Sequence, residues 1–174
     1  MSAPADALIE RARARAASVP DPEIPVVTLA DLGILRTVHA EAGRVVVTLT
    51  PTYTGCPATQ VIADDVRRAL AEEGIGDAEV RLTLSPPWTT DWISAEGRRK
   101  LREYGIAPPG AACGESIVRF VPRAAASAAA VETIECPRCG SADVERLSEY
   151  GSTPCKALYR CLACREPFDY FKPY

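Results

Sequence analysis

The sequence predicts an α+β protein, in which a small mixed sheet with helices packed on one face is followed by a smaller all-β domain. Over residues 1–121, segments with helical apolar spacing alternate with segments typical of strands. Residues 134–174 carry two close cysteine pairs, between which we expect the chain to fold back as strands. An alanine-rich stretch without a periodic apolar face, residues 122–133, predicts a linker between the two domains.

The first elements are a helix and a strand pair. Residues 5–18 predict an amphipathic helix, which ends before two prolines that cannot continue it. Residues 34–38 and 44–50 predict two strands joined by a turn at residues 41–43. The apolar face of the helix consists of Leu8, Ile9, Ala12 and Ala16.

The rest of the first domain completes the layer of helices and strands. Residues 59–73 predict a second amphipathic helix, and residues 79–84 predict a third strand. Ser94 is a suitable cap for a short helix that runs to Arg102, and residues 117–121 predict a last strand. From the alternation in the third strand we expect three side chains to point inward, namely Val80, Leu82 and Leu84.

Four cysteines near the C-terminus form the strongest pattern in the chain. Cys136 and Cys139 make one CxxC pair, Cys161 and Cys164 make another, and 21 residues separate the pairs. Four thiolates in this arrangement predict a tetrahedral structural zinc site, hence a zinc ribbon, and iron is the alternative metal for four sulfurs. Such a site has no open position for water, so we expect no catalysis at the metal.

Composition narrows the class of protein. The net charge is −3 with a pI near 5.3, which gives no electrostatic basis for nucleic-acid binding. No apolar run is long enough to span a membrane, and no signal pattern opens the chain, so we expect a cytoplasmic protein. A single histidine and the lack of a nucleophile motif indicate that the chain is not an enzyme. Three further cysteines, Cys56, Cys113 and Cys155, are expected to be thiols in a reducing compartment.

Cys56 lies between a predicted strand and a predicted helix. Pro57 follows it, and proline favours the first position of a helix, so Cys56 is expected at or beside the helix N-cap. Free backbone N–H groups and the helix dipole favour a thiolate there, the form that binds metals or attacks electrophiles. A small buried hydrophobic side chain is the alternative interpretation.

Two loops carry further candidate residues. Asp21 and Glu23 lie on a proline-held loop, where they could bind a metal, steer a partner or simply be solvated. Trp88, Asp91 and Trp92 lie in an aromatic, hydroxyl-rich segment after two prolines. Exposed tryptophan is typical of a protein interface, whereas packing beneath the sheet would make the same residues part of the core.

These motifs resemble known families. DPEIP at residues 21–25, the step Asp31-Leu32-Gly33 and TGCP at residues 54–57 resemble the iron–sulfur-assembly domain, in which the cysteine of the TGCP-type motif is the functional thiol. PPWTTDWIS and GSTPCK further resemble the accessory-subunit (PaaD) family of phenylacetyl-CoA 1,2-epoxidase. The resemblance implies that Cys56 is the thiol that handles iron or a transient iron–sulfur cluster, with Asp21 and Glu23 as its acidic neighbours. It also places the ribbon ligands at Cys136, Cys139, Cys161 and Cys164, with Cys155 in the GST-x-CK motif.

The resemblance implies a non-catalytic protein that assembles or maintains a metal centre in aerobic phenylacetate degradation. Its expected partners are the oxygenase and reductase components of the epoxidase, with no nucleic acid and no membrane. A homodimer would supply two Cys56 thiols to one cluster, and Cys113 is another source of a ligand. The alternative is a permanent structural adaptor subunit of the multicomponent oxygenase, in which Cys56 is merely buried.

Overall fold

The structure is a computed structural model that describes residues 3–53, 55–110 and 133–173. The chain forms two compact units, one that ends at Tyr104 and one that runs from Gly105 to Pro173. Cys113, the predicted strand at 117–121 and linker residues 122–132 lie outside the described residues. Within the described part of the chain, no helix is both long and apolar enough to cross a membrane.

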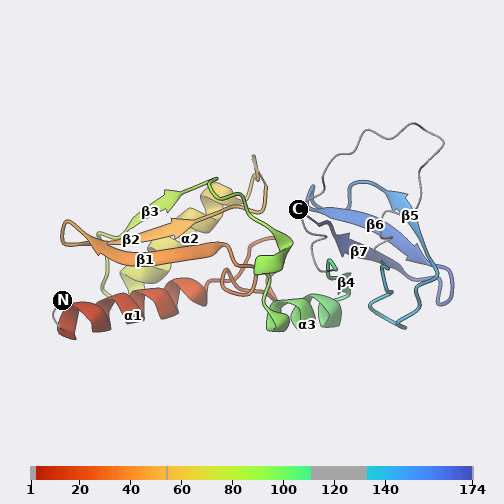
Figure 1. The fold of residues 1–174 in the computed structure, drawn as a ribbon, viewed down its shortest axis with the longest axis horizontal. Coiled ribbons are helices and arrows are strands. Elements are labelled where there is room, and N and C mark those ends of the chain that lie inside the picture. The colour runs from red at the N-terminus through yellow and green to blue at the C-terminus, as the bar shows by residue number, and fades with distance from the viewer. Residues whose placement is uncertain (1–2, 54, 111–132, 174) are drawn as a thin grey trace. The chain divides into compact units, whose positions relative to one another are not determined.

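The first unit is built on a three-stranded sheet (Figure 1). Strand β1 (Leu35–Glu41) pairs antiparallel with β2 (Arg44–Leu49), and β3 (Glu79–Leu82) pairs parallel with β2 on the other side. Helix α2 (Thr59–Glu72) connects the two parallel strands, and α1 (Ala3–Ala17) packs against α2 and the sheet. The core between helices and sheet includes Ala12, Ala16, Ile62, Val66, Leu70, Val45, Val47, Leu49 and Val80.

The inward direction predicted for the third strand is right only at its start. Val80 is buried, whereas Leu82 and Leu84 are 49% and 54% exposed. Strand β3 lies at the edge of the sheet and ends at Leu82, so Leu84 is outside the strand altogether. Alternation predicts which side chains share a face, but burial also requires a neighbouring element to cover that face.

The end of the first unit is joined to the core by a buried carboxylate. Helix α3 (Ala95–Tyr104) follows a short 3-10 turn, Thr90–Trp92. Ser94 caps the start of α3, where its hydroxyl accepts the Gly97 N–H at 2.8 Å. Lys100 of α3 reaches Asp31 at 2.7 Å. Burial by itself raises the pKa of Asp31, but hydrogen bonds from Lys100 and Thr28 outweigh this effect and hold the pKa below its usual value.

The second unit is a four-stranded sheet in the order β4-β7-β6-β5. Its strands are β4 (Ile106–Ala107), β5 (Val144–Ser148), β6 (Lys156–Cys161) and β7 (Pro167–Phe171). Strand β4 was not expected, because two residues give no periodic signal; it pairs parallel with β7. Gly105, at φ +97°, is the only residue between α3 and β4. The core of this unit consists of Ala107, Cys136, Ala157, Cys161, Phe168 and Tyr170.

Candidate functional site

The four cysteines predicted as ligands meet in the second unit. Their sulfur atoms all lie within 4.8 Å of one another. Two of the contacts are 3.8 Å, between Cys136 and Cys164, and 3.5 Å, between Cys139 and Cys161. Zinc–sulfur bonds of about 2.3 Å in a tetrahedron place neighbouring sulfurs about 3.8 Å apart. The cluster therefore has the donor set and the size of a closed four-thiolate zinc site.

The two CxxC pairs have the same backbone geometry. In each pair, the carbonyl of the first cysteine accepts an N–H from the residue after the second cysteine, at 2.9 and 3.0 Å. The N–H of the first cysteine donates to the carbonyl one residue further on, again at 2.9 and 3.0 Å. The residue after each pair is left-handed, with φ +75° at Gly140 and +68° at Arg165. Two identical turns thus present two sulfurs each.

The thiols of this cluster differ in acidity. Backbone hydrogen bonding from Cys164 lowers the pKa of Cys161 to about 7 despite its burial. At Cys164 the Glu166 N–H lowers the pKa, but desolvation and the neighbouring thiols outweigh it and raise the pKa to about 12. At Cys139 a hydrogen bond from the Ser141 backbone lowers the pKa, and interaction with Cys161 and desolvation raise it above its usual value. A dication would stabilise all four thiolates together, so metal binding must release protons.

Cys155 is not part of this cluster. It precedes β6, whereas Cys161 ends the same strand, so the two thiols belong to opposite ends of one strand. Cys155 is buried, and its sulfur lies 3.0 Å from the Thr153 hydroxyl. The next residue, Lys156, is also buried and faces Asp169 at 3.5 Å, while Ser152 donates to Asp169 at 2.9 Å. The GSTPCK segment is thus joined to β7 by an ion pair and a hydroxyl.

Cys56 lies in a different environment. Helix α2 begins at Thr59, as expected, but its N-cap is Ala58, so Pro57 is not the first helical residue and Cys56 lies two residues before the N-cap. The Cys56 N–H donates to the Tyr53 carbonyl at 3.4 Å, and its own carbonyl accepts from Thr59 at 3.2 Å. The side chain is half-buried. Within the described residues, the ribbon cysteines are the one group of three or more metal-ligating side chains, so no such group surrounds Cys56.

The two candidate acids have unequal surroundings. Asp21 is buried, and its Oδ1 accepts the N–H groups of Glu23 at 2.8 Å and Ile24 at 2.9 Å. Glu23 is exposed. The Asp21 carboxylate therefore holds its own loop, which is the common use of aspartate before a turn.

The tryptophans of the aromatic segment are not two exposed anchors. Trp88 is buried and donates its Nε1–H to the Leu32 carbonyl at 2.8 Å, so at this residue the core alternative holds. Trp92 is half-buried, with the guanidinium carbon of Arg36 lying 3.4 Å from its ring centroid. Asp91 is exposed. An interface role remains a prediction for Asp91 and Trp92.

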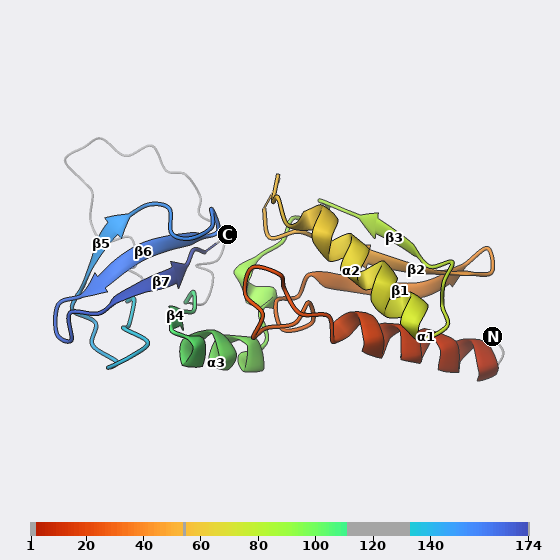
Figure 2. The same cartoon turned by 180° about the vertical axis from the view of Figure 1, so that it is seen from behind.

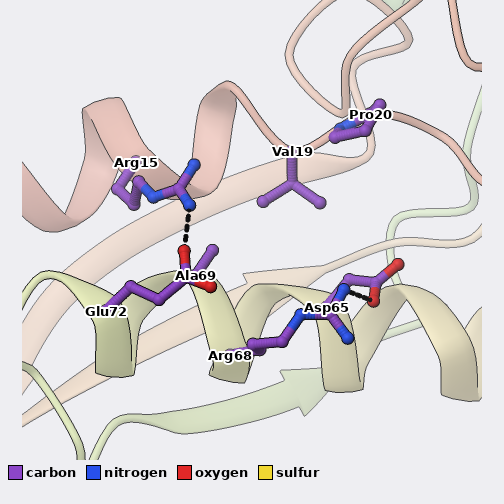
Figure 3. A pocket seen from close by; sticks show the side chains of 7 residues that line it. All are labelled: Arg15, Val19, Pro20, Asp65, Arg68, Ala69 and Glu72. Carbon is purple, nitrogen blue, oxygen red and sulfur yellow. Dashed lines mark hydrogen bonds and ion pairs between the residues drawn. The ribbon is translucent and has the colours of Figure 1, made fainter.

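A cavity of about 210 Å³ lies between the end of α1 and the side of α2 that faces it (Figure 3). Its charged side chains are paired, Arg15 with Glu72 at 2.5 Å and Arg68 with Asp65. Val19, Pro20 and Ala69 complete the lining. None of the residues singled out from the sequence lines it, and its ion pairs leave no unbalanced charge for a ligand.

Two protein families match separate parts of the chain. Residues 122–172 match the family described as the PaaD zinc beta ribbon domain, which includes all four clustered cysteines. Residues 9–82 match the family described as an iron–sulfur cluster assembly protein, and this match includes Cys56. The zinc ribbon predicted from the cysteine spacing is confirmed, and zinc is its structural metal.

Individual relatives extend these matches. A putative subunit of 1,2-phenylacetyl-CoA epoxidase from Escherichia coli (strain K12) is 47% identical over 88% of this chain and 86% of its own length. The Fe–S protein maturation auxiliary factor YitW of Bacillus subtilis (strain 168) is 37% identical over 51% of this chain and 88% of its own. The crystal structure of a domain of unknown function, DUF59, from Bacillus anthracis aligns with a TM-score of 0.52 at 29% identity. That alignment covers 56% of this chain and 94% of the other.

Proposed function

The chain belongs to the family of the putative 1,2-phenylacetyl-CoA epoxidase subunit of Escherichia coli, and on that premise we propose that it is a non-catalytic accessory protein. Its task is to assemble or maintain a metal centre, an iron–sulfur cluster or iron, of the phenylacetyl-CoA epoxidase system. The clients are the oxygenase and reductase components, and the compartment is the cytoplasm. Three relatives that match 42–51% of this chain are named Fe–S protein maturation auxiliary factors, and residues 9–82 match the iron–sulfur cluster assembly family, which supports an assembly role.

The observation that carries the proposal is the contrast between two kinds of thiol in one chain. The ribbon has a closed set of four sulfurs, which suits a metal that stays bound. Cys56 is one half-buried thiol on a loop, without a ligand cluster among the described residues. A single accessible thiol binds iron weakly enough to release it, which a carrier requires. Cys56 is therefore the handling residue in this proposal.

The two acids have separate roles in this function. Asp21 keeps the loop of residues 21–27 in shape, because its carboxylate is already occupied by two backbone N–H groups. Glu23 is exposed on the same loop and is the carboxylate that iron or a client could reach. The ribbon, with zinc bound, serves as the folded surface that recognises a client. Asp91 and Trp92 are a second candidate surface for that contact.

The test separates maturation from turnover. Oxygenase and reductase are produced in cells that contain the wild-type chain, the Cys56→Ser variant or neither, and their iron, acid-labile sulfide and turnover are then measured. We expect components matured with wild type to work without this protein. Components matured with Cys56→Ser should be poor in metal and slow, although the variant itself keeps one zinc per chain.

The contrary result is equally clear. If wild-type protein added at assay time raises the rate of fully metallated components in proportion to its amount, it is a permanent subunit of the oxygenase. In that case Cys56→Ser would support normal metal content, and the adaptor role would replace the assembly role. Zinc content of the variant serves as the folding control, because the ribbon ligands are unchanged.

A further inference from the structure

The first unit contains two uncharged segments, one of which includes the Cys56 loop. Residues 45–63 contain no Asp, Glu, Lys, Arg or His, and neither do residues 82–90. About a quarter of the whole chain is charged, so two such segments in one unit stand out. The first segment includes β2 after its first residue, Arg44, then the Cys56 loop and the first turn of α2, and the second begins with the last residue of β3.

The fold brings both segments to one end of the sheet. Leu82 is the register partner of Leu49, and the Thr83 N–H donates to the Leu49 carbonyl at 2.9 Å. The chain leaves β2 immediately after Leu49 to form the Cys56 loop and then α2. Figures 1 and 2 show the end of β3, the start of α2 and the connection between β2 and α2 at the same end of the sheet.

Apolar side chains are exposed at this end. Val61 in the first turn of α2 is 49% exposed, Leu82 is 49% exposed and Leu84 is 54% exposed. Strand β3 is an edge strand, with β2 as its partner on one side and no partner on the other among the described residues. We call Cys56, Val61, Leu82 and Leu84 the neutral rim. An apolar patch beside a free sheet edge is a typical site of protein contact.

We propose that the occupant of the neutral rim is a second copy of this chain, arranged so that two Cys56 thiols face one shared iron or iron–sulfur cargo. A two-fold interface brings each residue near the axis close to its own copy, so charged residues there would repel one another. The absence of charge from residues 45–63 and 82–90 removes this repulsion. A client of opposite charge would instead be recognised by charged residues, and residues 45–63 and 82–90 contain none.

Ligand number also favours a second copy. Cys56 is the only cysteine in the first unit's described residues, and one thiolate cannot hold a cluster in place. Two thiolates from two copies hold the cargo and leave its remaining positions open to ligands of a client. This inference rests on the proposed function, because it takes Cys56 as the handling thiol.

The size of the patch predicts when the dimer forms. Three half-exposed side chains per copy supply much less area than the roughly 1,200–2,000 Å² of a stable interface. The copies should therefore associate weakly without cargo and firmly once two thiolates share it. Dimerisation that depends on cargo distinguishes this arrangement from an obligate dimer.

The experiment measures the mass of the protein before and after it is loaded with iron and sulfide. Full-length protein with its zinc is loaded anaerobically with ferrous iron and sulfide, and its mass is followed by light scattering. Wild type should shift from 18.6 kDa to twice that mass on loading. Leu84→Glu should weaken loaded dimerisation by about a hundredfold, because like charges would meet across the two-fold axis. Leu147→Glu is the matched control: Leu147 is 49% exposed but lies in β5 of the ribbon, and its variant should dimerise like wild type.

Several results would overturn the inference. These are wild type that loads iron and sulfide as a monomer, Leu84→Glu that dimerises as well as wild type, or Cys56→Ser that does so. The maturation assay distinguishes failure of this inference from failure of the proposed function. If monomeric Leu84→Glu supports full client metal content while Cys56→Ser does not, the second copy is wrong and the assembly role stands. If Cys56→Ser also supports full metal content, the assembly role itself is wrong.

Discussion

The ribbon thiols and Cys56 show how backbone geometry gives one residue type two opposite uses. In the ribbon, two matching turns, each closed by two backbone hydrogen bonds, hold four sulfurs within 4.8 Å of one another. At Cys56, the chain makes one turn before α2 and presents a single half-buried sulfur. A preformed set of four ligands retains its metal, because releasing it means breaking four bonds from a folded frame. A single ligand has no such frame, so a metal bound to it exchanges readily.

Removing one ribbon thiol should have the largest effect, because it removes one of the four zinc ligands that distinguish the ribbon from Cys56. In Cys139→Ser, zinc should fall from one per chain to almost none, and residues 133–173 should become sensitive to protease. The reason is that the free energy of zinc binding, about 10–16 kcal/mol in small zinc domains, stabilises the folded state. The first unit should keep its thermal transition. Cys155→Ser is the control, since its thiol lies outside the cluster. Full zinc content together with unchanged protease resistance in Cys139→Ser would show that the cluster does not hold the ribbon together.

The ribbon is also held at the end of β6 away from zinc, where Lys156 is buried against Asp169. Asp169→Asn leaves the ammonium without its counter-charge and should lower the free energy of unfolding of the ribbon by about 3 kcal/mol. Zinc stoichiometry should not change, because Asp169 is not a ligand. Denaturant unfolding of the zinc-loaded protein measures the effect. The control is Glu145→Gln, whose partner Arg160 is exposed, with an expected loss below about 1 kcal/mol. Equal losses in the two variants would mean that burial of Lys156 does not matter.

In the first unit, which contains Cys56, substitutions of Asp21 and Glu23 should distinguish a structural role from a role in metal handling. Asp21→Ala removes the acceptor of two backbone N–H groups and should cost about 1–2 kcal/mol of stability in the first unit. Glu23→Ala should change stability by less than about 0.5 kcal/mol, because this side chain is exposed. Thermal unfolding compares the two variants directly. An Asp21→Ala protein of unchanged stability that no longer supplies metal to clients would make Asp21 a ligand and not a loop residue.

The smallest effect concerns the difference between the two ribbon turns. Gly140 and Arg165 occupy the same left-handed position, which is strained for arginine. Arg165→Gly should therefore stabilise the ribbon by about 1 kcal/mol, and Gly140→Ala should destabilise it by a similar amount. Resistance to unfolding at a fixed chelator concentration ranks the variants. If Arg165→Gly were less stable than wild type, a contact of the arginine side chain would outweigh the strain.

Local patterns in the sequence predicted most elements. The first helix was expected at residues 5–18 and runs from Ala3 to Ala17, and the second was expected at 59–73 and runs from Thr59 to Glu72. The Ser94 cap was also expected from the sequence and is seen. These features depend on neighbours within a few residues, so short-range spacing contains the necessary information. Strand β4 does not depend on such neighbours. Its two residues form a strand only because they pair with β7, about sixty positions later.

By itself, the sequence determined the four clustered cysteines and the presence of both an α+β part and a zinc ribbon. Each CxxC pair presents its two sulfurs through a local turn, so the candidate ligands can be identified from spacing alone. Only the tertiary structure decided which apolar side chains of residues 82–88 are covered. Trp88 is buried and donates to the Leu32 carbonyl, while Leu82 and Leu84 stay exposed, although all three are apolar residues of one short stretch. Burial depends on what another part of the chain places over a residue, and no local pattern contains that information.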